Sequence, residues 1–96
     1  MEFSVYITRS AKKSAKKLPL LVRHEVVRLS REIIAKNPYD AERLQKPLDE
    51  CHSFHFKINN VHYRIAYRII ADEKRVDVVL VGSREGFYER LTRVLR

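Results

Sequence analysis

Two segments of alternating apolar and polar residues flank the dipeptide Asn59-Asn60, and this pattern sets the tightest limits on the fold. In the first segment, 53–58, every second residue is apolar, and the alternation resumes in 61–70 with aromatic and β-branched side chains. Such a period of two is typical of half-buried strands. Asparagine tolerates positive φ, so the dipeptide suits a two-residue type I′ turn. We therefore predict a β-hairpin with strands at 53–58 and 61–70.

A turn of this length also determines the register of the hairpin. Counting back from the turn places Lys57 opposite His62 and His55 opposite Arg64, and directly opposed residues share a face of a sheet. Four basic or imidazole side chains therefore gather on one strand face. Like charges opposite each other destabilise a sheet, which favours a functional cluster. The alternative, a solvated basic face with no chemistry, stays open at this point.

A third strand is predicted at 75–81, where the run VDVVLV follows a turn at Asp72-Glu73. This turn places Arg68 opposite Asp77 on the neighbouring strand. Opposite charges in that position stabilise a sheet, so we interpret Arg68 and Asp77 as a structural ion pair.

The same register brings Arg84 toward the basic hairpin face. It places Arg84 beside Val61, at the end of the central strand where Lys57 and His62 lie, and Tyr88 follows one helical turn later. Arginine binds phosphate oxygens in bidentate fashion, and lysine binds them as a point charge. Imidazole can move a proton, and tyrosine can stack on a base or donate a proton. The group therefore suits a phosphate and requires no metal.

The rest of the chain is expected to supply one more strand and the helices. The expected segments are a strand at 2–7, a helix at 10–18 capped by Thr8 or Ser10, a helix at 20–36, an irregular segment at 39–48 and a short helix at 86–95. In the long helix an apolar stripe is expected to face the core, and it consists of Val22, Val26, Leu29 and Ile33, widened by Val27 and Ile34. We predict an α+β fold in one domain, 1–96: an N-terminal strand, a helical hairpin, a three-stranded antiparallel meander and a short C-terminal helix, with the helices on one face of a single sheet.

Charge narrows the classes of partner. The 96 residues carry 20 lysines and arginines against 12 acidic residues, which gives a net charge of +8. Such a surplus on a small domain indicates a polyanionic partner, either a nucleic acid or an acidic protein.

The cysteine count and the hydropathy of the chain argue against disulfide-rich, zinc-binding and membrane-spanning proteins. The one cysteine, Cys51, excludes a disulfide framework, and together with His52 and His55 it falls short of a usual zinc site. We therefore expect no metal and no other cofactor. No apolar run is long enough for a membrane span, and the first residues do not resemble a signal peptide. We expect a cytoplasmic protein without membrane contact.

In these residues the chain resembles the RelE/ParE toxin superfamily over essentially its whole length. The opening VYITRSAKKSAKKLP, followed by VRHEVVRL, is similar to the family's first strand and helical hairpin. The segments FHFKINNVHYRIAYRI and VDVVLVGSREGFY contain two short motifs, Tyr63-Arg64-Ile65-x-Tyr67 and Gly82-x-Arg84-x-x-x-Tyr88. Both motifs resemble those of the branch that cuts mRNA on ribosomes.

The resemblance implies a RelE-like fold and a ribosome-dependent mRNA endonuclease toxin of a type II toxin–antitoxin system. In such toxins the 2′-hydroxyl of the mRNA attacks its own 3′-phosphate and a 5′-hydroxyl leaves, with no metal. Position by position, Lys57, Arg64, Arg84 and Tyr88 match the family's phosphate-binding and acid–base positions. Arg64 would bind the phosphate, Arg84 the phosphate or the leaving oxygen, and Tyr88 would stack or act as acid. His55 stands where relatives often have a second lysine, so the general base is either His55 or Lys57.

The resemblance also implies partners, namely the ribosome, mRNA and a cognate antitoxin. Ribosomal RNA would bind His62 and a wider basic surface made of Lys12, Lys13, Lys16, Lys17, Arg23, Arg28 and Arg31. An acidic, partly disordered antitoxin would suit a chain of charge +8. Two other functions stay open: inhibition of DNA gyrase, as in the ParE branch, and a non-catalytic basic RNA-binding domain.

Overall fold

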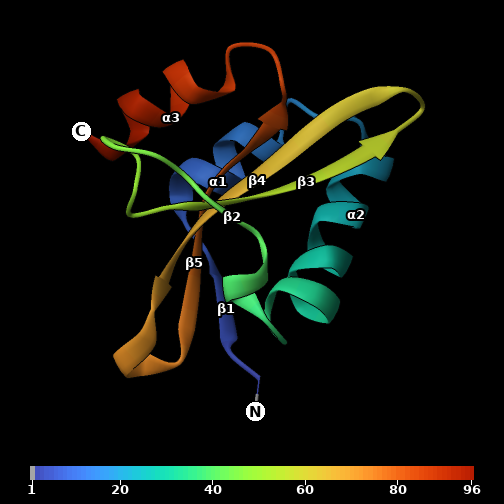
Figure 1. Cartoon of the computed structure of the whole chain (residues 1–96). Coiled ribbons are helices and arrows are strands. Elements are labelled where there is room, and N and C mark those ends of the chain that lie inside the picture. Colours follow the sequence, from blue (N-terminus) through green and yellow to red (C-terminus); the bar gives the residue numbers. More distant parts are fainter. Residues whose placement is uncertain (1) are drawn as a thin grey trace.

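A mixed five-stranded sheet, in the order β1-β5-β4-β3-β2, forms the centre of the structure (Figure 1). This computed structural model describes residues 2–96. Its strands and helices are β1 Ser4–Ile7, α1 Arg9–Ala15, α2 Leu20–Leu29, β2 Glu42–Arg43, β3 His52–Ile58, β4 Val61–Ile70, β5 Arg75–Ser83 and α3 Phe87–Leu95. β1 pairs with β5 in parallel, and the other neighbouring strands pair in antiparallel fashion. The predicted α+β class and order of elements are confirmed.

The β3–β4 hairpin has the predicted turn and register. Both residues of Asn59-Asn60 have positive φ, 50° and 65°, as a type I′ turn requires. Lys57 pairs with His62, and His55 pairs with Arg64. The sequence therefore placed these four side chains on the correct common face.

The segment predicted to be irregular, 39–48, contains an edge strand. Glu42 and Arg43 form β2 and pair with β3, with Glu42 opposite Ser53. A 3-10 turn, Pro38–Asp40, leads into the strand. Two residues are too few to show an alternating pattern, so the sequence contained no signal for β2.

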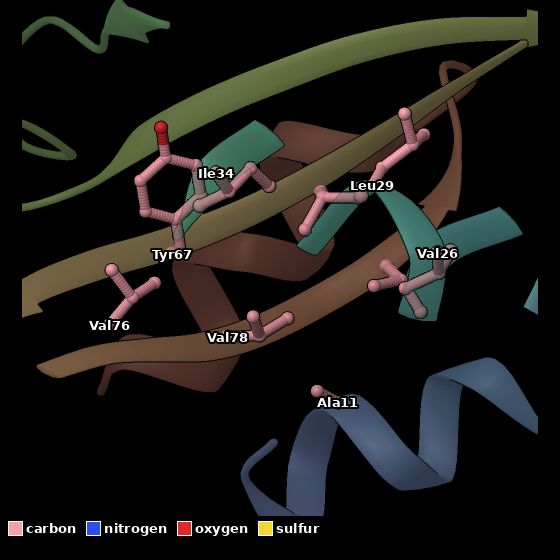
Figure 2. Close-up of a cluster of buried hydrophobic side chains, with 9 residues drawn as sticks. Ala11, Val26, Leu29, Ile34, Tyr67, Val76 and Val78 are labelled. Carbon is pink, nitrogen blue, oxygen red and sulfur yellow. The ribbon is translucent and has the colours of Figure 1, made fainter. Parts of the chain in front are cut away.

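The helices cover both faces of the sheet, which corrects the expectation that they share one face. α1 and α2 pack on the face that presents Tyr67 and Val78 (Figure 2). Phe87 and Leu91 of α3 pack instead with Ala66. Ala66 and Tyr67 are neighbours on β4, and successive strand residues point to opposite faces. In Figure 1, α3 (red) accordingly stands apart from α2 (teal), with strands between them.

A β-bulge shifts the register between β4 and β5, with Val79 as its extra residue. Beyond the bulge, the backbone N–H of Arg84 donates to the carbonyl of His62 (2.9 Å). A register without a bulge would have placed Arg84 beside Val61. Because neighbouring strand residues point to opposite faces, the shift aligns Arg84 with His62 and its face, rather than with the face under α1 and α2.

A π-helical turn, Ser30–Ile34, continues α2 within the helix predicted at 20–36. The wider turn adds one residue to the local helical period. As a result Ile34 is buried, with 1% of its surface exposed, and Ile33 is turned outward, with 43% exposed. The expectation that Ile33 and Val27 face the core is therefore wrong, since Val27 is also 43% exposed. The other positions of the stripe are buried as predicted, namely Val22, Val26, Leu29 and Ile34.

Arg68 lies opposite Asp77 as predicted, but the ion pair involves a different arginine. The carboxylate of Asp77 accepts hydrogen bonds from Nε and Nη2 of Arg75, at 2.7 and 3.2 Å. Arg75 precedes Asp77 by two residues on the same strand, so both side chains project from one face. The Nε atom of Arg68 is buried and has no hydrogen-bond partner among residues 2–96.

α1 begins at one of its two predicted caps, Thr8. The Oγ1 atom of Thr8 accepts a hydrogen bond from the N–H of Ala11 (3.3 Å) and donates one to the carbonyl of Val78 (2.8 Å). The cap therefore also fixes α1 to β5. Within residues 2–96, no helix combines the length and the apolar character that a membrane span requires.

Candidate functional site

The hairpin end of the sheet carries the predicted site residues on the face that packs elsewhere against α3. Two cross-strand pairs lie side by side there, His55 with Arg64 and Lys57 with His62. His55, Lys57 and His62 are exposed, and Arg64 is half-buried. Arg84 joins them from the loop after β5, through its backbone contact with His62. We call these five residues the cationic cluster.

α3 reaches the cationic cluster through Tyr88. The guanidinium carbon of Arg64 lies 4.9 Å from the centre of the Tyr88 ring, which is a cation–π contact. Tyr88 in turn makes an edge-to-face contact with the buried ring of Phe87, with the ring centres 5.9 Å apart. The position of Arg64 therefore depends on the docking of α3 as well as on the hairpin.

His55 has the electrostatic surroundings of a proton acceptor. Burial and the neighbouring charge of Arg64 lower the pKa of His55 from its ordinary value of 6.5. Glu42 of β2 acts in the opposite direction, with its Oε1 atom 3.4 Å from Nε2 of His55. The net lowering of the pKa favours the neutral imidazole near neutral pH. A neutral imidazole beside a guanidinium can accept a proton from a hydroxyl next to a phosphate.

Two hollows flank the cationic cluster. One has a volume of about 320 Å³ and is lined by Asn60, Val61, His62, Ser83, Arg84 and Glu85. The other has a volume of about 280 Å³ and is lined by Glu42, Leu44, Gln45, Leu48 and Tyr88. The cluster thus lies between a polar depression beside Arg84 and a partly apolar one beside Tyr88.

A known protein family matches most of the chain. Residues 5–92 match the family model described as the ParE-like toxin of type II bacterial toxin–antitoxin systems. The chain belongs to this toxin family. Among curated proteins, no sequence matches the toxin.

Solved structures with the same fold are RelE toxins, alone or with their antitoxin. The toxin–antitoxin complex RelBE2 from Mycobacterium tuberculosis contains a chain with a TM-score of 0.79 and 24% identity, which covers 88% of this toxin and 100% of that chain. A free mutant of the Escherichia coli toxin RelE gives a TM-score of 0.76 with 22% identity, covering 97% and 98% of the two chains. The intact E. coli RelBE complex gives 0.68 with 23% identity, covering 86% and 98%. At these identities the likeness establishes the RelE-like fold.

Apart from His62, which belongs to the cationic cluster, the predicted RNA-binding cations lie in the α1 region, in α2 and in the π-helical turn. Lys13 and Lys17 of the α1 region line a hollow together with Arg90 and Arg93 of α3. The four lysines of the α1 region are exposed, as is Arg31 in the π-helical turn, and Arg23 is half-buried. Arg28 differs from the others because it is paired with Glu25 and also contacts Glu32 at 3.4 Å. These contacts raise the pKa of Arg28 and partly neutralise its charge. The sequence did not distinguish Arg28 from its neighbours.

The side chains that could ligate a metal are dispersed. Within the described part of the chain, 2–96, no group of three or more histidine, cysteine, aspartate or glutamate residues is placed to hold an ion. Cys51 is fully buried, and burial, with a smaller effect of Glu50, raises the pKa of its thiol to about 11. The thiolate form that binds zinc is therefore disfavoured at Cys51.

Sequence reasoning missed Glu42. It lies in the segment expected to be irregular, yet β2 brings it to the same sheet face as His55. A lone acidic residue in a basic chain gives no signal of its own. Only the pairing of β2 with β3 shows that a carboxylate borders the cationic cluster.

Proposed function

We propose that this toxin is a ribosome-dependent mRNA endonuclease that cleaves without a metal. The observation that carries the proposal is the pair formed by His55, whose pKa is lowered, and Arg64, whose guanidinium rests on Tyr88. An imidazole that can act as a base thus neighbours a guanidinium that can bind phosphate, and this guanidinium lies over an aromatic ring. Those are the groups that an attack of a 2′-hydroxyl on the neighbouring phosphate requires.

In the proposed reaction, the base removes the proton of the 2′-hydroxyl as its oxygen attacks the adjacent 3′-phosphate. The bond from phosphorus to the 5′-oxygen of the next nucleotide breaks, and that oxygen leaves as a hydroxyl after taking up a proton. The products are a 2′,3′-cyclic phosphate and a 5′-hydroxyl end. Arg64 binds the phosphate oxygens, and Arg84 binds the phosphate or the leaving oxygen, which stabilises the charge that develops in the transition state.

His55 is our preferred base, and Lys57 is the alternative. With the carboxylate of Glu42 near Nε2, the imidazole proton is best placed on that nitrogen, and Nδ1 is then the proton acceptor. Lys57 would act as base only in its neutral form, among cationic neighbours. Tyr88 holds Arg64 and can also stack on a base or donate the proton to the leaving oxygen.

The two hollows support a path for single-stranded RNA across the cationic cluster. Nucleotides on either side of the scissile phosphate would occupy the depressions beside Arg84 and Tyr88. Exposed lysines of the α1 region supply a second basic surface, suited to ribosomal RNA. The net charge of +8 also suits an acidic antitoxin as inhibitor.

Primer extension tests the proposal directly. The toxin is added to a message with and without translating ribosomes, and a variant carrying both Arg64→Ala and Arg84→Ala serves as the control. We expect cuts at codons only on the translated message, with 5′-hydroxyl ends, and none with the variant. Intact message in the presence of active toxin would overturn the proposal.

Inhibition of DNA gyrase is the second candidate, because the matching family model is named after ParE. A supercoiling assay with purified gyrase separates the two functions. Loss of supercoiling together with intact message would replace the first function by the second. Neither effect, with binding to RNA retained, would instead indicate a non-catalytic domain.

A further inference from the structure

Arg90 of α3 donates hydrogen bonds to backbone carbonyls at the loop between β5 and α3. Its Nη2 atom donates to the carbonyl of Ser83 at 2.9 Å and to that of Glu85 at 3.2 Å. Its Nε atom makes a longer contact with the carbonyl of Gly86, at 3.4 Å. One guanidinium therefore links most of the loop carbonyls to the first turns of α3, where its carbon also lies 5.8 Å from the ring centre of Phe87.

Arg84 lies between the carbonyls that Arg90 binds. Its own N–H donates to the carbonyl of His62 (2.9 Å), and its carbonyl accepts from the N–H of Phe87 (3.3 Å). The backbone at Arg84 is thus fixed from β4 on one side and from α3 on the other. The Arg84 side chain itself is exposed. Its direction therefore depends on how firmly this loop backbone is held.

The absence of a side chain at Gly82 leaves space for the guanidinium of Arg90. A Cβ atom added at Gly82 would lie 3.1 Å from both Nη atoms of Arg90, closer than ordinary contacts. Gly82 pairs with Arg64 on β4, so the guanidinium of Arg90 lies over β5 on the face of the cationic cluster. A side chain at position 82 would therefore require the guanidinium of Arg90 to shift by a few tenths of an ångström.

We infer that Arg90 is a positioning residue for Arg84, acting through the loop and without contact with the RNA. The inference deepens the proposed function, and its kinetic part rests on that function. Its structural part does not, because the order of the loop can be measured in a toxin that cleaves nothing. Neither motif found in the sequence includes Arg90.

The structural part is tested by amide hydrogen exchange on the purified toxin. Arg90→Gln is compared with Arg93→Gln, which removes the same charge from an exposed position of α3. We expect exchange at the Arg84 amide to accelerate about tenfold or more in Arg90→Gln, and to stay unchanged in Arg93→Gln. Unchanged protection at Arg84 in a folded Arg90→Gln protein would overturn the inference.

The kinetic part is tested by a double-mutant cycle. Arg90→Gln should lower kcat about 10- to 100-fold with little change in KM, since a misplaced catalytic group loses mainly transition-state binding. In an Arg84→Ala background, Arg90→Gln should have no further effect on kcat. An equal loss of kcat in both backgrounds would show that Arg90 does not act through Arg84 and would contradict the inference.

Gly82→Ala offers a reciprocal test that does not depend on the removal of a charge. It should also accelerate exchange at Arg84, by less than Arg90→Gln does, because the guanidinium of Arg90 must shift by a few tenths of an ångström, and combining it with Arg90→Gln should add nothing further. If Arg90→Gln lowers the yield of folded protein, Gly82→Ala and the milder Arg90→Lys carry the same measurement. Normal protection at Arg84 in both would contradict the inference. A wild-type toxin that fails to cleave mRNA would remove the proposed function and leave the exchange result to decide on Arg90.

Discussion

The guanidinium carbon of Arg64 lies 4.9 Å from the centre of the Tyr88 ring, and this contact joins the β3–β4 hairpin to α3. Arg64 therefore has two neighbours, His55 on the adjacent strand and Tyr88 of α3. Across the strands it lowers the pKa of His55, and in the other direction it rests on an aromatic ring. A substitution at Tyr88 should therefore first change the position of the Arg64 side chain.

Tyr88→Leu and Tyr88→Phe separate the ring from the hydroxyl. Phenylalanine keeps the cation–π contact, whereas leucine loses it, together with about 0.5–1 kcal/mol of stability. We expect Tyr88→Phe to retain cleavage within about threefold and Tyr88→Leu to lose about tenfold or more. Single-turnover cleavage and urea denaturation measure the two effects. A large loss in Tyr88→Phe would assign the role of general acid to the hydroxyl.

The lowered pKa of His55 predicts the pH dependence of cleavage. If His55 is the base, the rate rises with pH through a pKa below 6.5 and is level at neutral pH, because the imidazole must be neutral to accept a proton. Replacing Glu42 by glutamine removes the opposing charge, so the rising limb should move to lower pH. A rate that keeps rising above pH 8 would point to Lys57 instead.

The lowered pKa of His55 should also make the free energy of unfolding depend on pH. A histidine whose pKa is lowered on folding binds more protons in the unfolded state, so stability rises with pH over this range. The contribution of His55 is therefore fully present above about pH 6.5 and is lost as pH falls toward the pKa of the folded state. His55→Gln should flatten this part of the stability profile, and a slope unchanged by that substitution would show that other groups cause it.

Arg28 should matter less for RNA binding than the free lysines of the helix surface. Its contacts with Glu25 and Glu32 offset its charge, whereas Lys17 is exposed with no ion pair in residues 2–96. We expect Lys17→Gln to weaken binding to ribosomes and to reduce its salt dependence by about one counterion, and Arg28→Gln to change neither. Titrations at several salt concentrations measure both. Equal effects of the two substitutions would contradict the prediction.

The hairpin and its basic face could be predicted from the sequence because a two-residue turn fixes every cross-strand pair near it. The pairs of His55 and Lys57 follow from counting alone. The register of β5 could not be counted, because the bulge at Val79 lies within a run of similar apolar residues. The same run conceals that both faces of β5 are covered, since strands buried on both faces lose their alternation.

The other errors also arise from one-residue effects. The π-helical turn adds one residue to the helix, and the core position passes from Ile33 to Ile34. β2 brings Glu42 to His55 although it is only two residues long. Hydrophobic periodicity averages over several residues, so a change of one or two residues falls below what it can detect.

Arg68 and Arg75 provide a test of which arginine neutralises Asp77. Asp77 is 7% exposed and is bonded by Arg75, while the buried Nε atom of Arg68 has no partner in residues 2–96. Arg75→Met should therefore destabilise the toxin by about 1–2 kcal/mol, because it leaves a buried carboxylate short of donors. Arg68→Met should be neutral or slightly stabilising, because it removes an unpaired polar group and keeps the apolar stem. Urea denaturation of both variants decides the matter, and a larger loss for Arg68→Met would restore the ion pair that the sequence predicts.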